Sequence, residues 1–387
     1  MPEPQTGPAV TSTASHFWVD TSEALREAAG CLAGARALAV DTEADSFYHY
    51  QHKCCLVQVS DGAVVYLIDP LAIRDLGPLR EVLGSPAILK VLHAAEQDVL
   101  YLRRDHDIGL APLFDTMIAA QLLGREGIGL ARLLEVHFEV RLDKGCQRDD
   151  WSRRPLSERQ QTYAAEDVRH LIRLSDLLRA DLEARGRLEW AEEEFALVAR
   201  RAWEPRVADP NAFWSVKGAR DLAPREAAVL RELHALRERR AMAADLPPFR
   251  ILSDEALLAL ARKRPARAHD MQGIKGVTTL VRRRIGDEVL EAVRAADALP
   301  ETELPVPPRG IGRRKTAAMQ ARLERLREWR KERAVALAMD PGVLFPLATL
   351  EAIAIAGVAA LETSDAVPGL RRWRRGLILP DAARLLA

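Results

Sequence analysis

Apolar residues in the first half of the chain fall into short runs that predict a mixed α/β fold. The runs 37–41, 55–60 and 64–69 are rich in apolar or β-branched side chains, and an Ser-Asp-Gly turn at 60–62 separates the last two. We expect these runs to form an antiparallel meander. Two further strands are predicted at 88–94 and 110–115.

Between and after these strands the apolar residues follow helical spacing. Helices are predicted near 75–83, within 95–105, and at 116–124 and 130–138. A longer amphipathic helix is predicted from Ser157 to about residue 186, because the Ser157 hydroxyl can accept a hydrogen bond from a free amide of a first helical turn.

From about residue 205 the strand-like runs end, and helical segments rich in Ala, Leu and Arg take over. An internal repeat is visible in this half. Its matching pairs are 233–242 with 323–335, 253–261 with 347–354, and 271–293 with 364–386. The stretch 343–361 is apolar enough to raise the question of a membrane span, but its place inside the repeat predicts a pair of buried helices.

These patterns divide the chain into an α/β domain and two small helical domains. The linker between the helical domains is rich in proline and is expected to be extended. The predicted boundaries are a disordered tail at 1–15, the α/β domain at 16–204, the first helical domain at 205–298, the linker at 299–312 and the second helical domain at 313–387.

Charge is unevenly distributed, although the formal net charge is +0 at pH 7. Acidic residues are in excess in the first 200 residues and basic residues in the remainder. An acidic half suits cations, whereas a basic half suits a polyanion such as nucleic acid. The four cysteines form no CxxC pair, and the N-terminus has no basic segment followed by an apolar core. We therefore expect free thiols and a cytoplasmic location.

Four carboxylates stand at the edges of apolar segments, where solvated charges are less expected. Asp41 and Glu43 end a strand, Asp98 follows another strand, and Asp167 comes four residues after Tyr163. Strand alternation places the first two on one face, and helical spacing places Tyr163 and Asp167 together.

Acids that converge in this way repel one another unless a cation lies between them. Oxygen-only ligands favour Mg²⁺ or Mn²⁺ over Zn²⁺. Paired divalent ions held by carboxylates are a common device for hydrolysing phosphodiesters. The four acids therefore predict a site for two divalent metal ions.

The order of these motifs resembles the DEDD superfamily of 3′-5′ exonucleases, in the tyrosine-containing branch to which ribonuclease D belongs. The first motif matches Asp41-Thr42-Glu43, the second matches Asp98 in HAAEQDVLYL, and the third matches Tyr163 to Asp167. The helical repeats resemble HRDC domains, which are small nucleic-acid-binding modules. The resemblance implies a ribonuclease H-like α/β exonuclease domain followed by two all-α HRDC-like domains.

The resemblance also implies roles for the catalytic residues. Asp41 would bridge both ions, Glu43 and Asp167 would complete the shell of the first, and Asp98 would hold the second. Tyr163 would orient the attacking water. The expected activity is release of 5′-nucleoside monophosphates from RNA 3′ ends, with tRNA precursors as substrates, no membrane partner and a monomeric enzyme.

Other residues are candidates for substrate contacts. Phe47 can stack on a terminal base or lie in the core, and Lys144 and Gln147 can reach phosphate or remain in a solvated loop. His93 is expected to be structural or to contact the phosphate region of the terminal nucleotide, with catalysis as the alternative. Thr42, inside the first motif, is a further candidate for a substrate contact.

Three basic runs in the helical repeats, at 262–267, 274–284 and 371–375, are candidate phosphate contacts. Solvated surface is the alternative for each run. Two alternatives to the whole function also remain at this stage. One is a DNA 3′-5′ exonuclease, because the sequence does not reveal contacts to the 2′-hydroxyl. The other is an inactive nucleic-acid-binding scaffold.

Overall fold

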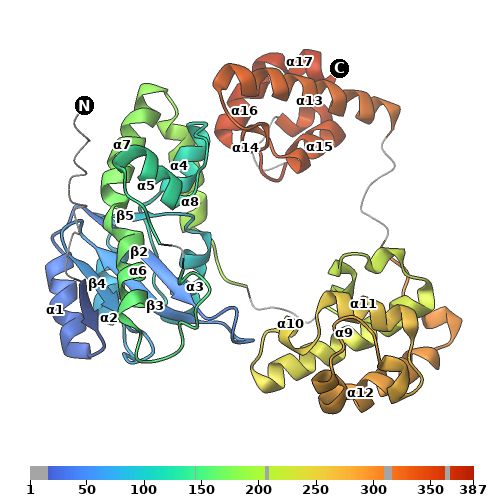
Figure 1. Ribbon diagram of the computed structural model, residues 1–387. Coiled ribbons are helices and arrows are strands. Elements are labelled where there is room, and N and C mark those ends of the chain that lie inside the picture. The colour runs from blue at the N-terminus through green and yellow to red at the C-terminus, as the bar shows by residue number, and fades with distance from the viewer. Residues whose placement is uncertain (1–15, 144, 205–208, 309–315, 362–366) are drawn as a thin grey trace, which may run out of the picture. The chain divides into compact units, whose positions relative to one another are not determined.

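The computed structural model describes residues 16–143, 145–204, 209–308, 316–361 and 367–387 (Figure 1). The chain divides into two compact units, and each combines segments that are distant in sequence. The first unit is Met1–Ala44, Cys54–Trp203 and Lys315–Ala387, and the second is Asp45–Lys53 and Glu204–Arg314. Among the described residues, no helix is both long enough and apolar enough to cross a membrane.

The α/β domain is built on one six-stranded sheet with the order β1-β4-β3-β2-β5-β6. Its strands are β1 (His16–Val19), β2 (Ala37–Ala44), β3 (Cys54–Ser60), β4 (Val65–Ile68), β5 (Leu89–Leu92) and β6 (Leu113–Asp115). β2, β3 and β4 form the predicted antiparallel meander, whereas β5 and β6 join it in parallel. The pairing of β1 with β4 was not predicted, because its four residues show no apolar alternation.

Most helices of the α/β domain follow the predicted pattern, but those at Ser22–Leu32 and Leu188–Ala199 were not predicted, and one long predicted helix is interrupted. The helices of this domain are α1 (Ser22–Leu32), α2 (Gly77–Gly84), α3 (Glu96–His106), α4 (Thr116–Leu122), α5 (Leu130–Phe138), α6 (Glu158–Arg169), α7 (Leu171–Ala184) and α8 (Leu188–Ala199). The single long helix predicted from Ser157 is wrong. It breaks at His170, where φ is −107° and the backbone N–H bonds to Val168 instead of continuing the helical ladder.

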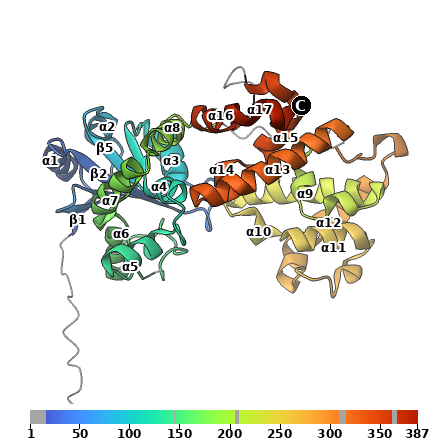
Figure 2. The ribbon, with the colours of Figure 1, turned by 90° about the horizontal axis from the view of Figure 1, so that it is seen from above.

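The first helical domain lies in the second unit and contains α9 (Pro224–Ala244), α10 (Pro248–Ile251), α11 (Asp254–Lys263) and α12 (Thr279–Asp297). α12 packs along α9 (Figure 1, Figure 2), and their buried faces form a core of their own. The predicted linker is not extended from its start. Glu301–Glu303 form a 3-10 turn, and Leu299 and Leu304 pack against this core.

The second helical domain lies in the first unit and shares its apolar core. It contains α13 (Ala317–Leu337), α14 (Pro341–Leu344), α15 (Leu347–Ala356), α16 (Arg372–Ile378) and α17 (Ala382–Leu386). α13 repeats α9 at the same length of 21 residues, as the internal repeat predicts. The apolar stretch from residue 343 includes part of α14, all of α15 and a 3-10 turn, and Leu350 and Ile353 are fully buried.

The basic run 371–375, a candidate for phosphate contacts, makes several contacts within the protein. Arg374 is buried and pairs with Glu194 of α8 at 2.8 Å. Arg371 pairs with the same carboxylate at 3.1 Å, and Trp373 stacks on Trp190 with ring centroids 4.9 Å apart. The run therefore attaches the second helical domain to α8, because acids on that helix supply the counter-charges.

Candidate active site

Asp41 and Glu43 lie near the end of β2, beyond the point where its neighbour β5 stops. β5 pairs with β2 only along Ala37–Ala39, whereas β3 pairs with β2 as far as Ala44. In the described sheet the last residues of β2 therefore have one edge without a strand partner. A register shift between Glu43 and Ala44 ends the regular pairing. The two acids share a face and are open to groups from other elements.

Asp98 approaches this edge from the first turn of α3. Its carboxylate accepts a hydrogen bond of 2.5 Å from the Thr42 hydroxyl, which ties α3 to β2. Asp115 holds the turn before α3, because it accepts hydrogen bonds from the N–H groups of Ala94 and Ala95 at 3.1 and 2.8 Å. Ala94 has a φ of +62°, which alanine rarely adopts. The bonds to Asp115 stabilise this conformation and fix where α3 begins.

Tyr163 and Asp167 lie one turn apart on α6, and the interaction with the Tyr163 side chain lowers the pKa of Asp167 against the opposing effect of burial. The start of α6 is fixed by a capping box. The Ser157 hydroxyl accepts from the Gln160 N–H at 3.3 Å, and the Gln160 side chain accepts from the Ser157 N–H at 3.0 Å. The predicted N-cap is therefore confirmed, and it fixes where the helix that carries Tyr163 and Asp167 begins.

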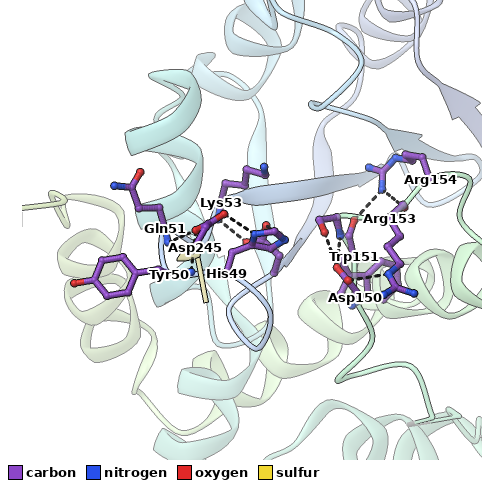
Figure 3. Close-up of polar contacts among 11 residues, drawn as sticks. His49, Tyr50, Gln51, Lys53, Asp150, Trp151, Arg153, Arg154 and Asp245 are labelled. Carbon is purple, nitrogen blue, oxygen red and sulfur yellow. Dashed lines mark hydrogen bonds and ion pairs between the residues drawn. The ribbon is translucent and has the colours of Figure 1, made fainter. Parts of the chain in front are cut away.

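Arg154 anchors the segment before α6 to the sheet. Its guanidinium donates to the buried carboxylate of Asp69 at 2.6 and 2.8 Å, which is a bidentate geometry. It also donates to the carbonyl of Cys55 at 2.6 Å and to that of Trp151 at 2.8 Å (Figure 3). The Trp151 ring lies 6.0 Å from the Tyr163 ring. The Arg154 contacts thus support the wall against which the Tyr163 phenol packs.

Three of the four carboxylates that the sequence predicted to converge lie together. Asp41, Glu43 and Asp167 each offer an oxygen, and these oxygens all lie within 4.8 Å of one another. Burial raises the pKa of Asp41 well above its usual range, and the charges of Asp98 and Asp167 raise it further. Burial and the charge of Asp167 act in the same direction on the pKa of Glu43.

The pKa values of the other three members of the site are also raised. Burial raises the pKa of Asp98 to about 6, against the opposing effect of the Thr42 hydrogen bond. Burial raises the pKa of Asp167 to about 7. The pKa of Tyr163 is raised by burial and by the neighbouring carboxylates, so the phenol stays protonated at neutral pH.

This donor set fits divalent cations. Half-buried carboxylates in close contact are costly when ionised, and a bound cation offsets both their desolvation and their mutual repulsion. The cluster offers only carboxylate oxygens, which suits a hard ion. Asp98 lies outside the three-residue cluster, but its charge raises the pKa values of Asp41 and Glu43.

A cleft of about 400 Å³ opens over the carboxylates, a volume typical of a small-ligand site. Its polar side is formed by the acids and Tyr163. Leu130, Leu142 and Leu171 supply an apolar side. The cleft therefore combines ionisable side chains on one side with an apolar surface on the other.

Only some of the residues predicted to contact substrate line the cleft. His93, Gln147 and Thr42 line the cleft, although the Thr42 hydroxyl is already bonded to Asp98. Phe47 is 47 % exposed and belongs to Asp45–Lys53, which groups with the second unit. Lys144 lies outside the described residues.

Two features of the site were missed by the sequence interpretation. Asp149 is half-buried, and its charge raises the pKa of Glu43. Its place in an Asp-Asp-Trp sequence is a signal, but no spacing rule connects that segment to β2. The three leucines of the apolar side come from separate elements, so no local pattern groups them.

The loop Asp45–Lys53 joins β2 to β3 but is held by the first helical domain. Asp245 follows α9 in a left-handed conformation with φ of +47°. Its carboxylate accepts hydrogen bonds from the N–H groups of Tyr50 at 3.1 Å and Gln51 at 3.3 Å, and it contacts His49 Nδ1 at 2.7 Å (Figure 3). One side chain thus fixes three successive residues of the loop that continues from Glu43.

Comparisons with known proteins agree with this architecture. A 3′-5′ exonuclease domain model matches residues 16–183, and an HRDC domain model matches residues 226–293 and 319–376. Ribonuclease D of Pseudomonas paraeruginosa is 36% identical over 353 residues, which is 89% of this chain and 91% of the relative.

Solved structures give the same result. The crystal structure of Escherichia coli RNase D, an exoribonuclease involved in structured RNA processing, matches with a TM-score of 0.73 and 28% identity, covering 96% of this chain and 98% of that one. The catalytic core of RRP6 from Trypanosoma brucei matches with a TM-score of 0.68 and 29% identity, covering 77% of this chain and 84% of that one. The expected fold class is confirmed, and the chain belongs to the ribonuclease D family of 3′-5′ exoribonucleases.

Proposed function

We propose that this chain removes nucleotides one at a time from RNA 3′ ends with the help of two divalent cations, Mg²⁺ or Mn²⁺. Asp41, Glu43 and Asp167 would hold the first ion, and Asp98 together with Asp41 would hold the second. When bound, such a pair lowers the pKa of a water and stabilises charge on the scissile phosphate. The convergence of three carboxylate oxygens within 4.8 Å carries this proposal.

Tyr163 acts as a neutral hydrogen-bonding group in this proposal. Its raised pKa keeps the proton on the phenol, so it does not serve as a general base. Tyr163 interacts with Asp167 and lines the cleft. Tyr163 therefore positions the attacking water while Asp167 fixes the direction of the phenol.

The cleft supports attack at a chain end. Its volume of about 400 Å³ holds a single terminal residue better than a continuous strand. The product would be a 5′-nucleoside monophosphate. We propose tRNA precursors as natural substrates, a monomeric enzyme and a cytoplasmic location. The Escherichia coli relative is described as acting in structured RNA processing, which supports a structured RNA substrate.

Digestion of 5′-labelled RNA and matched DNA with Mg²⁺, Mn²⁺ or EDTA tests the proposal. We expect stepwise shortening of RNA from the 3′ end with either metal and none with EDTA. Asp167→Asn should abolish shortening, whereas Asp143→Asn, at the rim of the same cleft, should retain most of it. Shortening that persists in EDTA or in Asp167→Asn would overturn the proposal, and faster digestion of DNA than of RNA would overturn the substrate assignment.

A further inference from the structure

We infer that His93 recognises the 3′-terminal ribose by accepting a hydrogen bond from one of its hydroxyl groups. This inference rests on the proposed function and assigns a specificity role within the same cleft. His93 follows β5 directly and precedes the turn that begins α3. It lines the cleft together with Asp41, Glu43 and Tyr163. His93 is therefore part of the wall of the cleft in which a terminal nucleotide would bind.

The hydrogen-bond network determines which ring nitrogen of His93 carries the proton. The Thr116 hydroxyl donates to the Leu92 carbonyl at 3.0 Å, so its only hydrogen is used there. The 2.9 Å contact between Thr116 Oγ and His93 Nδ1 then requires Nδ1–H to be the donor. In a neutral ring with this tautomer, Nε2 carries a lone pair and acts only as an acceptor.

The arrangement around His93 is rigid. Thr116 is fully buried in the first turn of α4, which Asp115 caps by accepting from two N–H groups. The same Asp115 holds the backbone of Ala94, next to His93. Burial lowers the pKa of His93 to about 4, so the ring is neutral at physiological pH. No other hydrogen bond of the His93 side chain is found within the described residues, which leaves Nε2 for a ligand.

An acceptor at this position selects a particular chemistry. A terminal phosphate offers mainly acceptor oxygens and negative charge, which would face both the Nε2 lone pair and the carboxylates. A ribose hydroxyl is a donor and is present on every nucleotide, unlike the amino groups of individual bases. His93 is thus not suited to the phosphate contact that the sequence suggested. It suits a free 2′- or 3′-hydroxyl and disfavours a 3′-phosphorylated end.

The test compares the native enzyme and its variants on RNAs that differ only at the 3′ end. One RNA sequence is prepared with a 2′,3′-diol, a 2′-deoxy, a 3′-deoxy or a 3′-phosphate terminus, and kcat/KM for the first cleavage is measured with Mg²⁺. For the native enzyme we expect removal of the recognised hydroxyl to lower kcat/KM about 3- to 10-fold. The two deoxy ends show which hydroxyl is involved.

His93→Phe keeps the ring volume and removes the acceptor. It should cleave the diol and the relevant deoxy end at equal rates, while His93→Gln, which offers a carbonyl oxygen, should restore part of the difference. Thr116→Val should also reduce the discrimination, because the Nδ1–H tautomer loses its partner. If His93→Phe proves unfolded by circular dichroism, the Gln and Val variants carry the same comparison.

The two levels of inference fail separately. If the native enzyme cleaves none of the ends with Mg²⁺ or Mn²⁺, the proposed function is wrong. If the native enzyme cleaves the diol end but all folded variants retain its full discrimination between hydroxyl and deoxy ends, only the role of His93 is wrong. His234→Ala, in the first helical domain, serves as a control and should leave the discrimination unchanged.

Discussion

Two groups of like charges occur in the first unit, and they are stabilised in different ways. At the start of α16, arginines are paired with acceptors inside the protein. Glu194 accepts hydrogen bonds from Arg371 and Arg374. Arg374 also donates to the carbonyls of Val343 and Leu344. At the cleft, no Lys or Arg in the described part of the chain pairs with Asp41, Glu43 or Asp167. The difference indicates that the arginine group is structural, whereas the acid group requires a ligand.

A charged cluster is therefore informative only when its counter-charges are known. In the sequence, the run 371–375 and the acid motifs are both candidate binding sites. In the structure, only the acids have raised pKa values caused by burial and mutual repulsion. Perturbed groups in a cleft are typical of functional sites, whereas satisfied charges at an interface are typical of docking surfaces. Substitutions in the acid group should lower activity without lowering stability, whereas substitutions in the arginine group or its partner Glu194 should lower stability.

The largest expected effect is on activity, in Asp41→Asn. The variant loses a charge that both proposed ion sites use, so we expect kcat/KM to fall about a thousandfold or more, equivalent to ~4 kcal/mol. Without divalent metal its stability to urea should be equal to or higher than that of the native chain, because one repelling carboxylate is removed. Unfolding in EDTA and nuclease assays on the same samples measure both effects. A variant that is both inactive and strongly destabilised would show that Asp41 is structural.

The next effect is on stability, in Glu194→Ala. Removing this carboxylate leaves the buried Arg374 without its counter-ion and Trp373 Nε1 without its acceptor, which is bonded at 3.0 Å. We expect a loss of roughly 2–3 kcal/mol, reduced from that of a fully orphaned ion because backbone carbonyls still accept from Arg374. Urea unfolding measures the loss.

Glu192→Ala is the matched control on the same helix, because Glu192 is exposed. Its stability should remain within about 0.5 kcal/mol of the native value. Equal losses in the two variants would show that α8 is sensitive to any loss of charge, and that Glu194 has no specific docking role.

A smaller effect is expected from pH. The folded pKa values of Asp98 and Asp167, about 6 and about 7, lie above their unfolded values, so the folded chain binds more protons in this range. In EDTA, stability should therefore fall as pH rises from about 4 to 7. Thermal unfolding across this range measures the trend, and Asp167→Asn should flatten it. With Mg²⁺ the decline should diminish, because the cation favours the ionised forms. A metal-free stability that rises steadily up to pH 7 would contradict the repulsion argument.

Local rules in the sequence predicted much of the fold and of the candidate site. Ser157 is followed by a helix with the expected cap, and the spacings 41–43 and 163–167 bring the acids together because strand and helix periods are fixed by backbone geometry. Lys90 shows where such rules end. It is fully buried in β5, and its ammonium donates to the carbonyls of Ser85 and Ile88, just before it in the chain, and to that of Ala111, before β6. The contact with Ala111 depends on tertiary packing, as does the pairing of Arg374 with Glu194.

Whether an arginine has an acidic partner inside the protein also decides which basic run to test for RNA binding. In the first helical domain, Arg283 and Arg284 are exposed on α12, and no ion pair to either is found among the described residues. They resemble the acids of the cleft in lacking an internal counter-charge. Arg372, although 80% exposed, lies 3.6 Å from Glu193 and belongs to the docking surface.

The smallest expected effect is therefore on RNA affinity, in the double variant Arg283→Gln and Arg284→Gln. If each side chain neutralises one phosphate, the slope of log Kd against log salt should decrease by about 2 or slightly less, and affinity at low salt should fall about tenfold. Arg372→Gln should leave the slope unchanged, because its charge is already partnered. Binding to labelled RNA in EDTA, which prevents cleavage, measures both. If Arg372→Gln lowers the slope as much as the double variant, an internal partner does not prevent an arginine from binding RNA. The distinction between partnered and unpartnered charges then fails at the surface, even if it holds in the cleft.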